Sequence, residues 1–141
     1  MNFTLITCTY APNEELFCRL IDAVKRLNFP EGSAVEWLIV DNNSPHPLAE
    51  VPYIKLGLKG IPYNRIITEQ KQGLTYARMR GIEEARYEWL VFFDDDNEPD
   101  AEYLTSARKT IKMHPDLGAL GPGIIKVEFI PPIRDKWILG K

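Results

Sequence analysis

The sequence predicts an α/β fold built on an open, mostly parallel sheet flanked by helices. Short runs rich in β-branched and aromatic residues alternate with helical patterns, which is the sequence form of repeated βαβ units. Two of these runs, 35–40 and 89–93, are almost unbroken apolar stretches, as expected for strands covered on both faces. With 141 residues, 45% of them hydrophobic, the chain is long enough for one such domain.

The first βα unit is predicted over residues 3–32. Residues 3–9 read as the strand, and a helix opens at Pro12 with two acidic residues in its first turn. The apolar positions of this helix recur at helical spacing, at Leu16, Leu20, Val24 and Leu27. The Pro- and Gly-containing stretch 29–32 ends it.

The rest of the chain continues the alternation. After the strand at 35–40, the segment 42–62 is rich in Pro, Gly and Asn, and it predicts an irregular loop with room for one short helix. The further predicted elements are a strand at 65–68, a helix at 74–85, a strand at 89–93, a helix that starts near Pro99 and ends near His114, and a strand at 124–130.

Composition excludes several classes of function. The 17 basic and 20 acidic residues give a net charge of −3, so bulk charge does not favour nucleic acid or an anionic membrane as a partner. The apolar runs are far shorter than the roughly 20 residues that span a bilayer. The N-terminus lacks the pattern of a secretory signal, and we expect a cytoplasmic protein.

Cysteine and histidine are too few for a metal or triad site of the common kinds. Cys8 and Cys18 fit two reduced, packed thiols better than a disulfide framework. With only His46 and His114, the usual zinc spacings cannot be assembled, and no Ser/His/Asp grouping is apparent.

Three adjacent carboxylates, Asp94, Asp95 and Asp96, directly follow the strand at 89–93. In an extended chain Asp94 and Asp96 point to the same side, about 6 Å apart, and at an effective dielectric near 20 they repel by about 3 kcal/mol. Mg²⁺ or Mn²⁺ bridging to a diphosphate would relieve that repulsion. The alternative is structural: Asp96 or Asn97 caps the following helix, and the other carboxylates are solvated.

Polar residues also end the neighbouring strands. Ligands of open parallel sheets bind beyond the carboxyl ends of the strands, so Thr9, Tyr10 and Asp41 are expected to share one crevice with the acidic triplet. Each has an ordinary alternative. Asp41 begins a common turn sequence, and Thr9 and Tyr10 can be purely structural.

An arginine interrupts the apolar stripe of the helix at 74–85. Leu74, Arg78 and Ile82 are four residues apart, which predicts that Arg78 lies on the buried side and reaches a phosphate or a carboxylate at the edge of the crevice. A structural ion pair with a strand-end aspartate is the alternative. Because neither G-x-G-x-x-G after the first strand nor a P-loop sequence occurs, we expect phosphate binding to depend on metal.

Four segments, in this order and spacing, resemble the nucleotide-binding half of family 2 glycosyltransferases, which are inverting enzymes of the Rossmann-like GT-A fold. They are Leu5-Ile6-Thr7-Cys8-Thr9-Tyr10, Trp37-Leu38-Ile39-Val40-Asp41-Asn42-Asn43-Ser44, Gly73-Leu74-Thr75-Tyr76-Ala77-Arg78, and Leu90-Val91-Phe92-Phe93-Asp94-Asp95-Asp96-Asn97.

The resemblance implies a donor site for a nucleotide-diphosphate sugar, with a UDP-sugar as the expected donor. Thr9, Tyr10 and Asp41 would line the base pocket, and Arg78 would close it. Asp94 to Asp96 look like the D-x-D element of the family. In that element Asp94 and Asp95 would contact the nucleotide, and Asp94 and Asp96 would hold Mg²⁺ or Mn²⁺.

The resemblance also implies what this chain lacks. The family's catalytic base lies in the acceptor-binding half, so we expect it beyond Lys141 and assign no catalytic residue within the chain. Residues 1–141 are expected to form a single donor-binding domain, truncated before that half and inactive in transfer alone. The acceptor, whether saccharide, lipid or protein, stays open. A full-length form would be cytoplasmic, with peripheral attachment at the inner face of the membrane as a further option.

Two other classes are weighed against this one. A nucleotidyltransferase on a related sheet would carry a Gly-rich, basic loop after the first strand, and residues 9–14 offer none. A non-catalytic nucleotide-binding module or a receiver-like signalling module is the non-enzymatic alternative. A receiver would place paired acids where this chain has Cys8, Thr9 and Tyr10.

Overall fold

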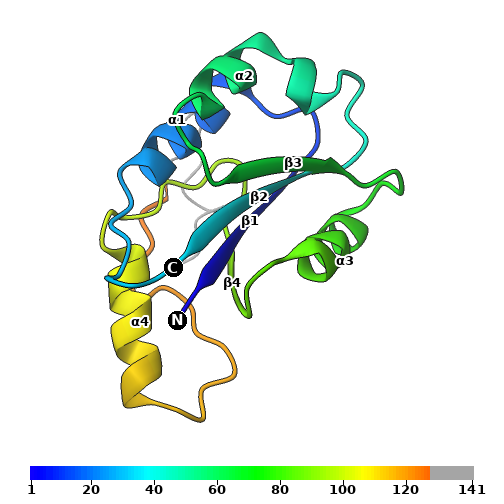
Figure 1. Cartoon of the computed structure of the whole chain (residues 1–141). Coiled ribbons are helices and arrows are strands. Elements are labelled where there is room, and N and C mark those ends of the chain that lie inside the picture. The colour runs from blue at the N-terminus through cyan, green and yellow to red at the C-terminus, as the bar shows by residue number, and fades with distance from the viewer. Residues whose placement is uncertain (128–141) are drawn as a thin grey trace, which may run out of the picture.

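The structure, a computed structural model, describes residues 1–127. In Figure 1, the strands of one open sheet run side by side with helices on both faces, and the predicted α/β architecture is confirmed. Within these residues the sheet has four strands in the order β3-β2-β1-β4, and every neighbouring pair is parallel. The strands are β1 (Phe3–Thr9), β2 (Val35–Asp41), β3 (Asn64–Thr68) and β4 (Trp89–Phe92).

The strand register brings the carboxyl ends of the strands together. Thr9 of β1 pairs with Asp41 of β2, and Asp41 pairs in turn with Thr68 of β3. On the other side of β1, Ile6 pairs with Phe92, so the acidic triplet begins two residues after the end of this ladder. Polar strand ends therefore meet at one edge of the sheet.

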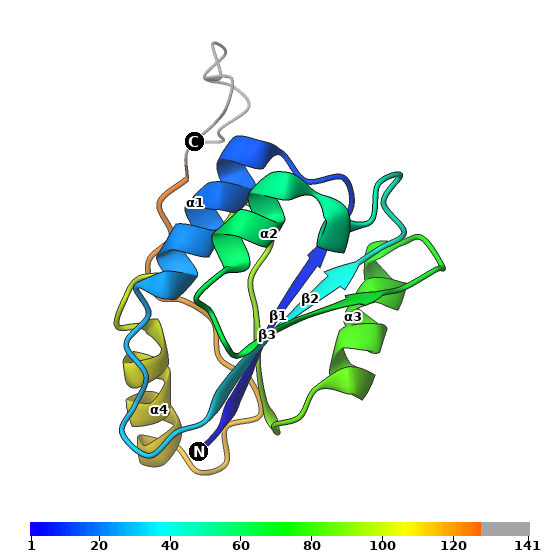
Figure 2. The same cartoon turned by 45° about the horizontal axis from the view of Figure 1, so that its top comes forward.

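In the described part of the chain, three helices cover one face of the sheet, and one helix covers the other. The larger core joins the sheet to α1 (Glu14–Lys25), α2 (Pro52–Leu58) and α4 (Tyr103–Met113). Figure 2 shows α1 and α2 lying side by side, with α3 (Leu74–Glu84) on the opposite side of the strands. The smaller core joins Ala77 of α3 to Ile6, Leu38 and Val40 of the sheet.

Helix α3 meets the sheet through its small residues. A Cβ added at Gly81 would lie 2.7 Å from Cγ2 of Ile6, and Ala77 is fully buried. The predicted buried stripe on this helix is therefore wrong, because only residues with little or no side chain fit at so close an approach. The stripe residues are exposed instead, with Leu74 at 51%, the Arg78 side chain at 45% and Ile82 at 43%.

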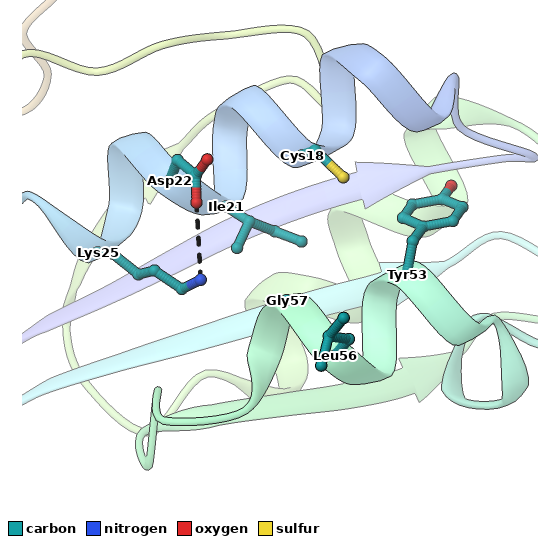
Figure 3. Close-up of a pocket in the computed structure, with 7 residues that line it drawn as sticks. All are labelled: Cys18, Ile21, Asp22, Lys25, Tyr53, Leu56 and Gly57. Carbon is teal, nitrogen blue, oxygen red and sulfur yellow. Dashed lines mark ion pairs between the residues drawn. The ribbon is translucent and has the colours of Figure 1, made fainter.

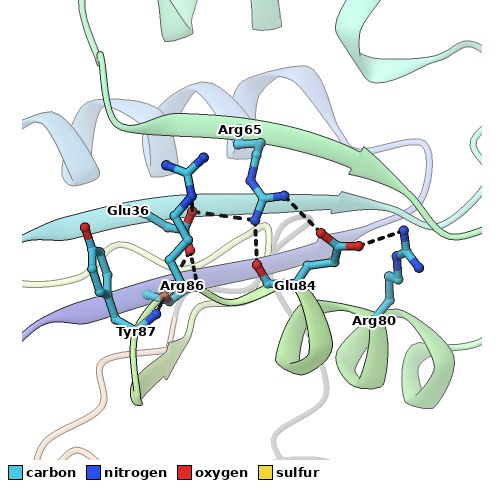
Figure 4. Close-up of polar contacts among 7 residues, drawn as sticks. Glu36, Arg65, Arg80, Glu84, Arg86 and Tyr87 are labelled. Carbon is cyan, nitrogen blue, oxygen red and sulfur yellow. Dashed lines mark hydrogen bonds and ion pairs between the residues drawn. The ribbon is translucent and has the colours of Figure 1, made fainter.

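The far end of α3 is anchored by ion pairs, as Figure 4 shows. Arg65 of β3 lies 3.1 Å from Glu84 of α3 and 3.6 Å from the buried Glu36 of β2. Arg86, just after the helix, lies 3.4 Å from Glu36, and Arg80 lies 2.9 Å from Glu84. Two strands and the end of the helix thus share one network of charges.

Several boundaries differ from those predicted. The segment 42–62 contains α2 and a short 3-10 helix at Leu48–Glu50, and α4 begins at Tyr103 rather than near Pro99. The prediction of a strand at 124–130 is wrong for residues 124–127, which are exposed and pair with no strand of the sheet. The remaining residues of that predicted strand lie outside the described range. Within residues 1–127, no helix is long and apolar enough to cross a membrane.

Candidate functional site

A small cavity of about 160 Å³ opens where β1 and β2 end and α3 begins. Thr9 and Tyr10 contribute from β1, Asn42 follows β2, and Asp95 follows β4. The residues lining the cavity are Cys8, Thr9, Tyr10, Asn42, Leu74, Ala77 and Asp95. An open parallel sheet places ligands at this edge.

The carboxylates of the acidic triplet have different partners. Asp95 points to the cavity and accepts a hydrogen bond from the buried hydroxyl of Thr9. Burial raises the pKa of Asp95, with the charges of Asp96 and Asp94 adding to the rise and the Thr9 bond opposing it. Asp96 accepts from the side-chain amide of Asn97 at 3.1 Å. Asp95 is thus bonded to β1, and Asp96 is bonded to the next residue in the chain.

Arg78 lies beside the first carboxylate of the triplet. Its Nη2 is 3.4 Å from Oδ1 of Asp94, and its guanidinium carbon is 5.9 Å from the centre of the Phe92 ring. The structure therefore contains the ion pair that the sequence left as an alternative. Because Arg78 is partly exposed, its guanidinium also keeps contact with solvent at the rim.

Asp41, which ends β2, is not among the residues that line the cavity. It is only 2% exposed, and its two carboxylate oxygens accept from the backbone N–H groups of Ser44 at 2.9 Å and Leu48 at 3.1 Å. These bonds organise the turn that follows β2. Each carboxylate oxygen has a second lone pair, so a hydrogen bond from a nucleotide base remains compatible with this geometry.

Asn42 lines the cavity, but the sequence alone predicts no role for it. The D-N-N-S sequence reads as a turn, and nothing in it marks one asparagine as more important than the other. Asn42 is buried, whereas Asn43 is exposed with a φ of 61°. No local signal could have separated them, because the partners of Asn42 lie about thirty residues away in the sequence.

A larger cavity, of about 280 Å³, lies between α1 and α2 (Figure 3). Its wall carries the Asp22–Lys25 ion pair, at 3.6 Å, and aliphatic side chains that include Ile21. It is lined by no residue from a strand end and by none of the acidic triplet. We assign the functional site to the smaller cavity, because polar groups from three strand ends converge there.

The donor set at the end of β4 is suited to a hard divalent cation. It consists of carboxylate oxygens, the ligands that Mg²⁺ and Mn²⁺ prefer. In the part of the chain that the structure describes, no group of three or more His, Cys, Asp or Glu residues is arranged to hold a metal by itself. An ion here would need further oxygens from phosphate and water, and such a shell is typical of Mg²⁺.

Cys8 gives a direct test of the burial of the cavity wall. Both cysteines are free thiols, and burial raises the pKa of Cys8 from 9.0 to about 11, with Arg78 opposing the rise and Asp94 adding to it. At pH 8 the thiolate fraction is then about 0.1%, against about 10% for an ordinary thiol of the same reference pKa. We expect the alkylation rate of Cys8 to be half-maximal near pH 11 in the folded chain and near pH 9 in urea, because the thiolate is the reactive form.

Mass spectrometry of the alkylated peptides separates Cys8 from Cys18, and Cys8→Ser removes the signal. A folded-state rate for Cys8 that is half-maximal near pH 9, as in urea, would contradict the buried position of this thiol.

A comparison with protein families identifies the chain. Residues 4–130 match the model described as glycosyl transferase family 2. The chain belongs to glycosyltransferase family 2. The family match covers the four strands of the described sheet except Phe3, together with α3 and the acidic triplet, so every residue that lines the cavity lies within it. No curated protein compared with the chain matches it.

Solved structures similar to the chain share the GT-A glycosyltransferase fold. The complex of S. aureus TarS 1–349 with UDP has a TM-score of 0.67 and 22% identity, covering 89% of this chain and 38% of that one. The mannosyltransferase PcManGT from Pyrobaculum calidifontis, in complex with GDP-Man and Mn²⁺, has a TM-score of 0.66 and 21% identity, covering 77% and 32%. The chain spans 20% to 39% of the length of the TarS structures.

The expected position of the catalytic base is not part of this site. The resemblance places that base beyond Lys141, and Lys141 itself lies outside residues 1–127, which the structure describes. A base in the acceptor-binding half therefore stays a prediction, as does the inactivity of residues 1–141 in transfer.

Proposed function

We propose that this family 2 chain binds the donor of a glycosyl transfer, a nucleotide-diphosphate sugar, together with Mg²⁺ or Mn²⁺. The observation that carries the proposal is the convergence of polar strand ends on one cavity, with Asp95 bonded to Thr9 and Asp94 paired with Arg78 beside it. The TarS complexes with UDP and with UDP-GlcNAc favour a UDP-sugar as donor. The acceptor is a hydroxyl compound of unassigned class.

Each group in the site has a proposed role. Thr9 and Tyr10 line the pocket for the base, and Asp41 accepts a hydrogen bond from the base with a lone pair that Ser44 and Leu48 leave free. Asp94 and Asp95 contact the nucleotide.

Asp94 and Asp96 are the proposed ligands of the divalent cation, a role that fits the oxygen-only donor set. Bound there, the ion would neutralise charge that builds on the departing nucleoside diphosphate as the sugar inverts at C1. Arg78, at the rim, adds positive charge on the same side.

Calorimetry with UDP and Mn²⁺ tests the proposal. We expect saturable heat that chelation of the metal abolishes, and an affinity at least about tenfold lower in Asp96→Ala, because a metal ligand is lost. Asp116→Ala is the matched control: this aspartate is exposed, follows α4, and should leave the affinity unchanged. Repeating the titration with GDP compares the two nucleotides bound in the similar structures.

Three outcomes would contradict the proposal. They are the absence of heat with either nucleotide, heat that is unaffected by chelation, and equal affinities for Asp96→Ala and the wild type.

A further inference from the structure

Both amide hydrogens of the Asn42 side chain, and its oxygen, bond to other parts of the protein. Nδ2 donates to the carbonyl oxygens of Lys71 at 2.8 Å and Glu69 at 3.3 Å, and Oδ1 accepts from the backbone N–H of Gly73 at 2.8 Å. The residue is 6% exposed. Both amide hydrogens are therefore used, and Asn42 has no donor left for a ligand even though it lines the cavity.

These bonds connect segments that are far apart in the sequence. The loop at 69–73 links β3 to α3, and Asn42 holds it at three points. The backbone N–H of Asn42 also donates to the carbonyl oxygen of Thr9 at 2.9 Å. One buried residue thus joins the ends of β1 and β2 to the loop that leads into α3.

The loop determines where α3 begins. Gly73 caps the helix with φ 131° and ψ 135°, and its carbonyl oxygen accepts from Tyr76 at 3.0 Å and Ala77 at 3.1 Å. The first turn of α3 supplies Leu74 and Ala77 to the wall of the cavity. Holding the N–H of Gly73 in place therefore holds that wall in place.

We propose that Asn42 is a positioning residue of the donor site. It holds the 69–73 loop and the start of α3 against the strand ends, and it shapes the cavity without donating a hydrogen bond to the nucleotide. This inference rests on the proposed function, because it concerns the site in which the nucleotide is proposed to bind.

Asn64 provides a matched control, because its side chain makes the same kind of hydrogen bonds at another place in the sheet. Its Nδ2 also donates to two backbone carbonyl oxygens, those of Leu58 and Ile61, and it is part-buried. It lies at the start of β3, where it pairs with Trp37 at the opposite end of the ladder from Asp41. Asn64→Ala and Asn42→Ala therefore remove similar bonds at opposite ends of the sheet.

Hydrogen exchange of the 1–141 chain tests the first half of the inference. In Asn42→Ala we expect the Gly73 amide to exchange at least about tenfold faster than in the wild type, while the β1 and β2 amides keep their protection. Asn42→Asp keeps an acceptor for Gly73 and loses the two donors, so its exchange rate should fall between those of wild type and Asn42→Ala. Asn64→Ala should leave the Gly73 rate unchanged.

Nucleotide affinity tests the second half. We expect Mn²⁺-UDP to bind at least about tenfold more weakly to Asn42→Ala, with Asn42→Asp intermediate and Asn64→Ala at the wild-type value. The melting temperatures of the two alanine variants are compared to test whether this difference in affinity follows global stability.

Three results would overturn the inference. The first is unchanged Gly73 exchange in Asn42→Ala, and the second is equal loosening of the loop in Asn64→Ala. The third is a loosened loop with full nucleotide affinity. If the wild-type chain does not bind UDP, the proposed function fails, and the exchange experiment, which contains no nucleotide, still decides whether Asn42 holds the loop.

Discussion

Replacing Glu36 by alanine is expected to lower the free energy of unfolding by about 3 kcal/mol and the melting temperature by about 10 °C. The Glu36 side chain is only 3% exposed. Its Oε1 accepts from the backbone N–H of Arg86 at 2.7 Å and from the Thr4 hydroxyl at 3.1 Å, and its Oε2 faces Arg65 and Arg86. Alanine would leave these donors and charges without their common partner.

Two comparisons isolate the charge of Glu36 from its hydrogen bonds. Glu36→Gln keeps an acceptor for Thr4 and Arg86 and loses the negative charge, so a loss smaller than that of alanine is expected. Glu83→Ala, at an exposed position of α3, serves as the control and should change stability by no more than about 0.5 kcal/mol. Denaturant titration gives all three values. Equal stability of Glu36→Ala and Glu83→Ala would contradict a structural role for this carboxylate.

The sequence predicts β1 and β2 well because each has a strong local signal, whereas residues 124–127, which the sequence also assigns to a strand, form none. The strand at 3–9 consists of apolar and β-branched residues, and the strand at 35–41 is apolar apart from Glu36 and Asp41, as expected for strands covered on both faces. The ends of helices are less well predicted. Residues before Tyr103 form turns that a proline-based start of the helix does not reveal.

The buried face of α3 shows where hydrophobic periodicity fails. Periodicity assigns the bulky Leu74 and Ile82 to the interior, but the helix approaches Ile6 so closely that Gly81 must face the sheet. A glycine carries no hydrophobic signal, and its importance depends on a contact made with a residue far away in the sequence. Only the tertiary structure contains that information.

For the candidate site too, the sequence predicts some features and not others. Strand ends can be located from sequence, and the structure places Thr9, Tyr10 and Asp95 on one cavity. The interactions between segments cannot be located in that way. The bonds of Asn42 go to backbone carbonyl oxygens, which every residue possesses, so no residue type in the loop at 69–73 marks it as a partner.

Arg78→Ala is expected to weaken the binding of Mn²⁺-UDP by about 10- to 100-fold, the range for losing a hydrogen bond to a charged group. Arg78 is placed to act in two ways. It pairs with Asp94 at 3.4 Å, and its partly exposed guanidinium lies at the rim, where a diphosphate would bring negative charge. Arg78→Lys keeps the charge and loses the planar fork, so an intermediate affinity is expected.

A double-mutant cycle distinguishes the two roles of Arg78, holding Asp94 and contacting the nucleotide. If Arg78 acts only by holding Asp94, then Arg78→Ala combined with Asp94→Asn should bind no more weakly than Asp94→Asn alone. If Arg78 also contacts the nucleotide, the double variant should bind more weakly than Asp94→Asn alone. Arg26→Ala, at the exposed C-cap of α1, is the matched control and should bind like the wild type. Wild-type affinity in Arg78→Ala would exclude both roles. The guanidinium would then support binding neither by holding the Asp94 carboxylate nor by contacting the nucleotide.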